Sequence, residues 1–429
     1  MSSFSGFVLA WISLFVVLAI RSAARGRMQS ALVFIGIFFL YYGVPLVLDI
    51  AVGPVPEGTF RVFRGFGMSS ADPASNRAYL IFIAICPAIV WALGRPTVAP
   101  MPTRSMHTGG DAPKWLQRVL LVLVVAPFVA LLGTPDWDLS LAYGAITDPG
   151  LRSEEFSQFH ATLSLLLVVS LVAQAVLIVT MRRPSFLKVA VLIALALACV
   201  YLQGKRNGVA IWLFSLWCAF FLRGWLRRQG VVWALALFIV LAGFSIWYQE
   251  RRHLSAGARS FEEKYGEYRI EYGRDEHMKL AIYSLLNPER LKIVDYPGQS
   301  LLFSAMFFVP RAIFAGKPYP YHVYLTPAAI GYSGSNILAW GVTSSLLDEI
   351  VANCGWIGFL LGPLVFAWLC RLGDRSSRMT RLSTAGVIVL LMSVELAAFT
   401  PVLLIWLSLV AADRRLLSSG RFAWGPGRI

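Results

Sequence analysis

The sequence predicts an all-α membrane protein that crosses the bilayer many times. Of its 429 residues, 57% are hydrophobic and only 14% are charged, whereas soluble domains average about 25% charged residues. The apolar residues come in long runs and do not alternate in strands of about ten residues, which excludes a transmembrane β-barrel. Such runs cross a bilayer as helices, because a helix satisfies its own backbone hydrogen bonds.

The apolar runs define the expected spans, since a span needs about 20 mostly apolar residues. They cover residues 4–20, 29–50, 77–95, 117–134, 160–181, 186–203, 207–223, 231–248, 347–371 and 383–411. Pro401 lies inside the last run, and proline interrupts the helical hydrogen-bond ladder, so we expect two legs, 383–399 and 401–412. With one further short segment, this predicts about 10–12 transmembrane helices.

The basic residues orient the chain. Alternate connections are rich in Lys and Arg and belong in the cytoplasm by the positive-inside rule; they contain Arg25, Arg104, Arg183, Arg227 and Arg378. Three parts follow: an N-terminal bundle of about eight helices (1–248), a large periplasmic loop (249–346), and C-terminal helices with a cytoplasmic tail (347–429). The net charge of +15 fits this orientation and anionic lipid. No basic stretch interleaved with aromatic residues indicates nucleic-acid binding.

The large loop is predicted to contain amphipathic and re-entrant helices. Leu280, Tyr283 and Leu286 recur near one helical face, and Pro288 follows as a stop signal. The apolar segment 301–315 is too short to cross the bilayer and contains Pro310, so it is expected to be re-entrant or interfacial.

Two pairs of cations are predicted to bind an anion at the outer face. Lys205 and Arg206 precede the apolar stretch 208–222, whose 15 residues give about 22 Å of helix against a core of about 30 Å. This helix must therefore begin near Lys205, with both cations at the outer boundary, where they either bind an anion or extend to the interface. Arg311 lies inside an apolar segment and Lys317 lies in a rigid turn. The alternative for that segment is an amphipathic helix on the outer leaflet.

The general base is expected to be His322 or Glu349. His322 follows Tyr319 and Tyr321, whose rings either stack on sugars or belong to an interfacial aromatic belt, and imidazole titrates near neutral pH. The alternative is a merely exposed histidine. Ser344 or Ser345 is expected to cap the following helix, which places Glu349 in its first turns next to apolar sequence.

Desolvation at that position would raise the pKa of Glu349, as a base requires. Glu395, inside the last apolar run, is a second buried carboxylate. No motif for a metal or nucleotide cofactor occurs, so we expect none.

In this order, the segments resemble the Wzy-type O-antigen polymerases and, more distantly, the O-antigen ligases of the same superfamily. The resemblance covers roughly residues 200–370 in detail. The residues that carry it are Tyr201-Leu-Gln-Gly-Lys-Arg206, Val309-Pro-Arg311, Gly316-Lys-Pro318, Thr343-Ser-Ser-Leu-Leu-Asp-Glu349 and Asn353-Cys-Gly-Trp-Ile-Gly358.

The resemblance implies a glycosyltransferase that polymerises undecaprenyl-diphosphate-linked oligosaccharide repeat units into O-antigen or exopolysaccharide. It implies an active site on the periplasmic side of the bacterial inner membrane, inversion without a metal, and a chain-length regulator and a flippase as partners. In this scheme Arg206, Arg311 and Lys317 neutralise the pyrophosphate. Glu349 or His322 takes the proton of the acceptor hydroxyl.

Two other functions compete with this one. An O-antigen ligase, which transfers polymer to the lipid A core, would have similar topology and charge. A lipid-linked oligosaccharide flippase or other transporter would place charges within several spans around a central cavity, often in repeated halves. The notable charges here are predicted to gather at the outer face instead.

Overall fold

A computed structural model describes most of the chain. It covers residues 3–25, 27, 29–55, 60–95, 114–141, 154–181, 186–203, 260–309, 311, 313–336, 341–376 and 378–418, with isolated positions between 212 and 243. Within these ranges the regular structure is helical and contains no strand, as predicted. Five helical segments are long and apolar enough to cross a membrane: Ser3–Ala24, Ser30–Ala51, Pro73–Leu93, Lys114–Leu131 and Leu346–Asp374. These features identify a multi-pass α-helical membrane protein.

The chain forms two units, and the first is discontinuous in sequence. Unit 1 comprises Met1–Ser22, Gln29–Pro100 and Ala258–Ile429, and unit 2 comprises Ala23–Met28 and Met101–Gly257. From Ala258 onward, the predicted loop 249–346 thus belongs to the same unit as the first and last parts of the chain.

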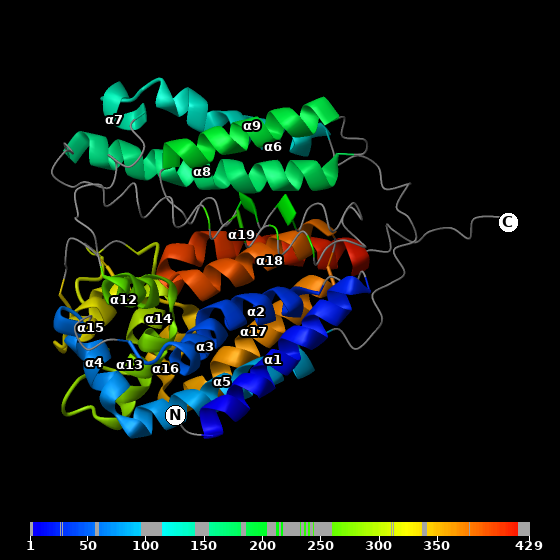
Figure 1. The fold of residues 1–429 in the computed structure, drawn as a ribbon. Helices are drawn as coiled ribbons and strands as arrows, with labels where there is room; N and C mark the ends of the chain where they lie inside the picture. The colour runs from blue at the N-terminus through cyan, green and yellow to red at the C-terminus, as the bar shows by residue number, and fades with distance from the viewer. Residues whose placement is uncertain are drawn as a thin grey trace. The chain divides into compact units, whose positions relative to one another are not determined.

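The long helices of unit 1 pack around a buried aromatic core. Helix α2 (Ser30–Phe38) continues through a π-helical turn (Phe39–Gly43) into α3 (Val44–Ala51). Helix α17 (Gly358–Asp374) packs against α2 and α5 (Pro73–Leu93), as Figure 1 shows. Helix α1 (Ser3–Ala24) contacts α5, where Nε1 of Trp11 donates to the carbonyl oxygen of Ala84. The rings of Phe34 and Phe366 lie 4.9 Å apart in the core. Asp374 then joins α17 to α2 by accepting hydrogen bonds from the backbone and hydroxyl of Ser30.

Unit 1 also contains five shorter helices from the second half of the chain, two of which carry predicted site residues. They are α12 (Phe261–Tyr272), α13 (Asp275–Leu286), α14 (Gln299–Ala305), α15 (His322–Ile330) and α16 (Leu346–Cys354). Helix α13 ends before Pro288, as predicted, but the prediction that it is amphipathic is wrong. Its residues 275–284 are all buried, because α4 (Arg64–Ala71), α5, α15 and α16 cover it.

The predicted span 347–371 contains two helices. Ser345 caps α16, as predicted, and forms a capping box with Asp348. Gly355 then adopts a positive φ of 59°, and a short turn (Gly355–Ile357) leads into α17. A Cβ on Gly358 would lie 2.7 Å from the carbonyl oxygen of Ile350, so only glycine permits this close approach.

The last apolar run forms two helices, but the predicted break at Pro401 is wrong. Helix α18 (Arg378–Ser393) ends before Glu395, and α19 (Leu396–Ser418) continues through Pro401. At this break the backbone N–H of Leu396 donates to Glu349 instead of to a carbonyl oxygen one turn earlier, and the carboxylate of Glu395 accepts hydrogen bonds from α15. A proline inside a membrane helix is tolerated when the neighbouring structure satisfies the freed carbonyl group.

Unit 2 contains α6 (Lys114–Leu131), α7 (Trp137–Leu141), α8 (Glu154–Thr180) and α9 (Phe186–Gln203). Helix α8 packs against both α6 and α9, and Figure 1 shows the three long helices running alongside one another. Buried side chains such as Leu167, Leu171 and Ala196 form its core. The predicted spans 207–223 and 231–248 lie outside the described residues, apart from isolated positions.

Candidate functional site

Three titratable side chains from distant parts of the sequence meet at the break between α18 and α19. His322 begins α15, Glu349 lies in the first turn of α16, and Glu395 lies in the break itself. Glu395 binds His322, while the next residue, Leu396, donates its backbone N–H to Oε2 of Glu349 at 2.9 Å. The two predicted bases are therefore connected through residues 395–396.

The imidazole of His322 is held from one side. Oε1 of Glu395 lies 2.7 Å from Nδ1, and Oε2 accepts the backbone N–H of His322 at 2.8 Å. The side chain remains 43% exposed, and Nε2 has no hydrogen-bond partner among the described residues. The hydrogen bond with Glu395 raises the pKa of His322. A carboxylate on Nδ1 favours the tautomer whose Nε2 lone pair accepts a proton.

Glu349 lies deeper than His322. Its side chain is fully buried, and each oxygen accepts a hydrogen bond: Oε1 from the Ser300 hydroxyl at 2.8 Å, and Oε2 from Leu396. The side-chain amide of Asn353 donates to the same Ser300 hydroxyl at 2.8 Å. Glu349 thus joins α14, α16 and the start of α19, and it satisfies a backbone donor at a helix N-terminus.

Arg311, Lys317 and Tyr319 form a second arrangement in the same unit. The guanidinium of Arg311 lies 4.0 Å from the ring centroid of Tyr319 and donates to the carbonyl oxygens of Lys317 and Pro318. Arg311 is an exposed residue, and its guanidinium has further N–H groups besides the two that donate to these carbonyl oxygens. The chain distance from Tyr319 to His322 is three residues, which places their Cα atoms within about 11 Å of each other.

Lys317 and Tyr321 lie inside the structure. The Lys317 amine is buried and donates to the carbonyl oxygens of Phe307 and Val309 at 3.0 and 2.9 Å. The ring of Tyr321 is 0% exposed, so it presents no face for stacking on a sugar in this conformation. Lys205 and Arg206 lie outside the described residues.

A second buried cluster of charges was not anticipated from the sequence. Arg269 of α12 bridges Asp49 of α3 and Asp275 of α13, each at 2.5 Å, and Lys279 bridges Asp275 and Glu276. Burial alone would raise the pKa of Asp275, but the charges of Arg269 and Lys279 outweigh it and lower the pKa to about 2. Glu276 is likewise buried, and burial raises its pKa.

The charge-rich sequence of this region is typical of a solvated surface, which explains why the cluster was missed. One signal was available: charged residues at 275, 276 and 279 share their helix with the apolar residues at 280, 283 and 286. Within the described ranges, no group of three or more His, Cys, Asp or Glu side chains is arranged to hold a metal ion.

Comparison of the chain with protein-family models, with curated proteins and with solved structures gave no match.

Proposed function

We propose that the protein is a membrane-embedded glycosyltransferase that polymerises undecaprenyl-diphosphate-linked oligosaccharide repeat units at the periplasmic face of the bacterial inner membrane. The observation that carries this proposal is the pair formed by His322 and Glu395, a half-exposed imidazole oriented by a carboxylate. The sequence resemblance supplies the reaction class. The proposed topology has 10–12 transmembrane helices and places segment 249–346 in the periplasm.

His322 is the better base of the two on geometric grounds. Its Nε2 is open to a substrate, whereas both oxygens of buried Glu349 already accept hydrogen bonds. In the proposed reaction, the acceptor hydroxyl oxygen bonds to the anomeric carbon of the growing chain while Nε2 takes the hydroxyl proton. The bond from that carbon to the diphosphate oxygen breaks, and its electron pair leaves with undecaprenyl diphosphate. Attack from the opposite face inverts the anomeric centre.

Arg311 is proposed to stabilise the departing diphosphate. Its guanidinium is exposed, is oriented by Tyr319 and two carbonyl oxygens, and belongs to the same loop as His322. An oriented guanidinium binds phosphate oxygens in pairs as negative charge develops. Lys205 and Arg206 are retained as further ligands of the diphosphate. Lys317 is assigned to holding this loop together through its two carbonyl partners.

The test is the banding of surface polysaccharide from a gene-deletion strain. We expect the deletion to leave a single repeat unit on the acceptor, and the wild-type gene to restore the ladder. His322→Gln and Arg311→Ala should fail to restore it although the protein is present in the membrane. Arg290→Ala, which removes an exposed arginine outside the proposed site, should restore it.

The same gel separates the rival functions. An O-antigen ligase would leave polymer on undecaprenyl diphosphate and no repeat on the acceptor, and a flippase would leave repeat units on the cytoplasmic side. Either pattern would contradict the proposal. A normal ladder with His322→Gln would contradict the role of His322 within it.

A further inference from the structure

Unit 2 contains a cavity of about 850 Å³ between α6, α8 and α9. Its lining is almost entirely aliphatic, and Leu121, Leu177, Val191 and Leu195 are typical members. Leu121 is 47% exposed and Val191 50% exposed, so the cavity opens at its α6 and α9 walls. A volume of this size is within the range of small-molecule and lipid sites.

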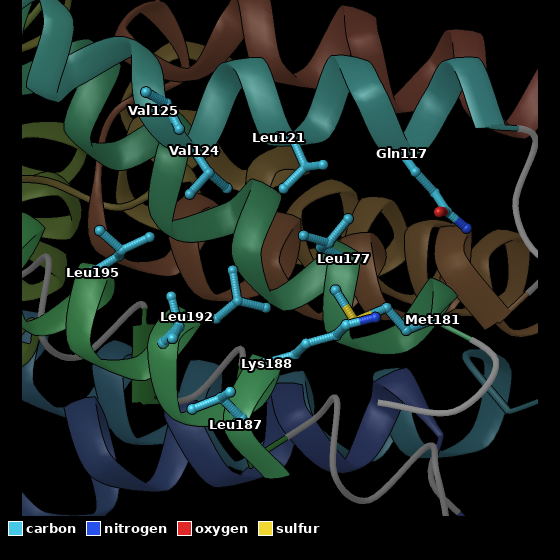
Figure 2. Close-up of a pocket in the computed structure, with 11 residues that line it drawn as sticks. Gln117, Leu121, Val124, Val125, Leu177, Met181, Leu187, Lys188, Leu192 and Leu195 are labelled. Carbon is cyan, nitrogen blue, oxygen red and sulfur yellow. The ribbon is translucent and has the colours of Figure 1, made fainter. Parts of the chain in front are cut away.

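The polar atoms of the cavity gather at one end. Figure 2 shows the amide of Gln117 and the amine of Lys188 at the end marked by Met181, with Val125 and Leu195 at the other end. At this polar end α6 and α9 begin and α8 ends. The occupant that fits such a lining is amphiphilic, with a negatively charged head and an apolar chain.

The length of the cavity fits one leaflet of the bilayer. From Gln117 to Val125 the α6 wall rises about 12 Å, whereas half of a hydrocarbon core is about 15 Å. In the sequence, Arg104 precedes α6 and Arg183 falls between α8 and α9, and the positive-inside rule assigns both connections to the cytoplasm. Anionic phospholipids attract basic groups at that surface.

We propose that the cavity between α6, α8 and α9 binds one anionic phospholipid of the cytoplasmic leaflet. Lys188 and Gln117 bind its phosphate, and an acyl chain lies along Leu121, Leu177 and Leu195. This proposal does not depend on the glycosyltransferase activity, because it concerns the other unit and its test measures binding alone.

The test uses the full-length protein, purified in detergent and titrated with palmitoyl-oleoyl phosphatidylglycerol or with the phosphatidylcholine of the same chains. Native mass spectrometry counts the bound lipids. We expect one phosphatidylglycerol per chain to be retained in preference to phosphatidylcholine. Lys188→Gln should lower its affinity about fivefold, which corresponds to about 1 kcal/mol for one cation at the membrane surface.

Two matched controls make the test specific. Arg118→Gln removes an exposed cation next to Gln117 that does not line the cavity, and it should change affinity by less than about twofold, as expected of a screened charge. Leu121→Trp should fill the cavity and abolish retention. Val122→Trp, at a neighbouring position that is 66% exposed and outside the lining, should leave retention unchanged.

Three results would overturn the proposal. The first is equal retention of phosphatidylglycerol and phosphatidylcholine. The second is equal loss in Lys188→Gln and Arg118→Gln, which would indicate diffuse attraction to surface charge. The third is displacement of phosphatidylglycerol by an equal concentration of undecaprenyl phosphate in a Lys188-dependent way, which would assign the cavity to a polyprenyl lipid.

Discussion

A carboxylate that binds both the backbone and the ring of one histidine fixes that residue more firmly than a single hydrogen bond would. Glu395 does this for His322, and the arrangement resists rotation of the imidazole about either of its side-chain torsions. At the scale of single residues, the consequences concern the protonation of His322 and the hydrogen bonds that hold the surrounding loop.

Removing the charge of Glu395 should change the titration of His322. In Glu395→Gln the pKa of His322 should fall towards its ordinary value of about 6.5, because the hydrogen bond to the carboxylate raises it. NMR of histidine-labelled protein measures this shift, with His322→Gln to identify the resonance. Because a base must be neutral, the acidic limb of the pH–rate profile of the proposed polymerisation should move to lower pH, while the rate at high pH drops as the ring loses its orientation. An unchanged titration would show that Glu395 does not control the ring.

The raised pKa of His322 also determines how the pair's contribution to folding stability changes with pH. The wild-type pair should stabilise the fold fully below a pH of about 6.5, and this contribution should disappear as pH rises through the raised pKa of His322. In Glu395→Gln this pH dependence should be absent.

Lys317→Met should destabilise the protein. The substitution keeps an apolar stem of similar length but leaves the carbonyl groups of Phe307 and Val309 without their donor, at a cost of about 1–3 kcal/mol. Thermal unfolding in detergent measures the change. Lys292→Met is the matched control, since that amine is exposed and donates to one carbonyl, and it should change stability by less than about 0.5 kcal/mol. Full stability of Lys317→Met, with loss of the polysaccharide ladder, would instead indicate a ligand of the diphosphate.

The types of the site residues were predictable, but their partners were not. His322 and Glu349 stood out because a histidine in an aromatic loop and a carboxylate beside apolar sequence are unusual. Their connection passes through Glu395, which is 73 residues from His322. No local pattern encodes a contact at that separation. The burial of Tyr321 was likewise not predictable from the sequence, because a Tyr-rich loop has the same composition whether its rings face outward or inward.

At the scale of elements, helix α16 depends on its N-terminus. Ser345→Ala removes the side-chain half of the capping box and should destabilise the protein by about 1 kcal/mol. Ser344→Ala is a closely matched control, because Ser344 is equally buried but its hydroxyl has no hydrogen-bond partner among the described residues. Chemical denaturation of the two variants gives the comparison. Equal stability of the two would mean that the cap contributes nothing to α16.

Helix α13 should depend on Arg269, which neutralises its first turn. Arg269→Met leaves the buried carboxylate of Asp275 without its main counter-charge, which costs about 3–5 kcal/mol. Burial then raises the pKa of Asp275, so the loss should be largest at pH 8 and smaller at pH 5, where the carboxyl group is more readily protonated. Unfolding measured at the two pH values checks the sign. Arg290→Met, at an exposed position, should change stability little at either pH.

The elements themselves were largely predictable, because burial in a bilayer imposes long apolar runs. The predicted spans 4–20, 77–95 and 117–134 correspond to α1, α5 and α6 with shifts of a few residues. The break at Glu395 and the burial of α13 were not predictable. Both depend on tertiary hydrogen bonds and ion pairs, which override the local signals of Pro401 and of charged sequence.

At the scale of the whole molecule, the predicted topology has a direct test. In a cysteine-free background, Asp295→Cys should react with a membrane-impermeant maleimide added to intact spheroplasts. Arg375→Cys should react only after the membrane is opened. Both positions are exposed, so differences in burial do not explain the contrast. Labelling of Arg375→Cys from outside would place segment 249–346 in the cytoplasm and remove the basis for a periplasmic active site.

The pairing of Asp49 with Arg269 has a consequence for the order in which the protein is made. The two residues are 220 positions apart, and the ribosome adds about 5–20 residues per second, so Asp49 is in place about 11–44 s before its partner is synthesised. The delay is longer for Ser30, because its partner Asp374 follows it by 344 residues. The early helices of unit 1 are therefore synthesised before their tertiary partners exist. The whole of unit 2 is translated before the last helices of unit 1, which supply those partners.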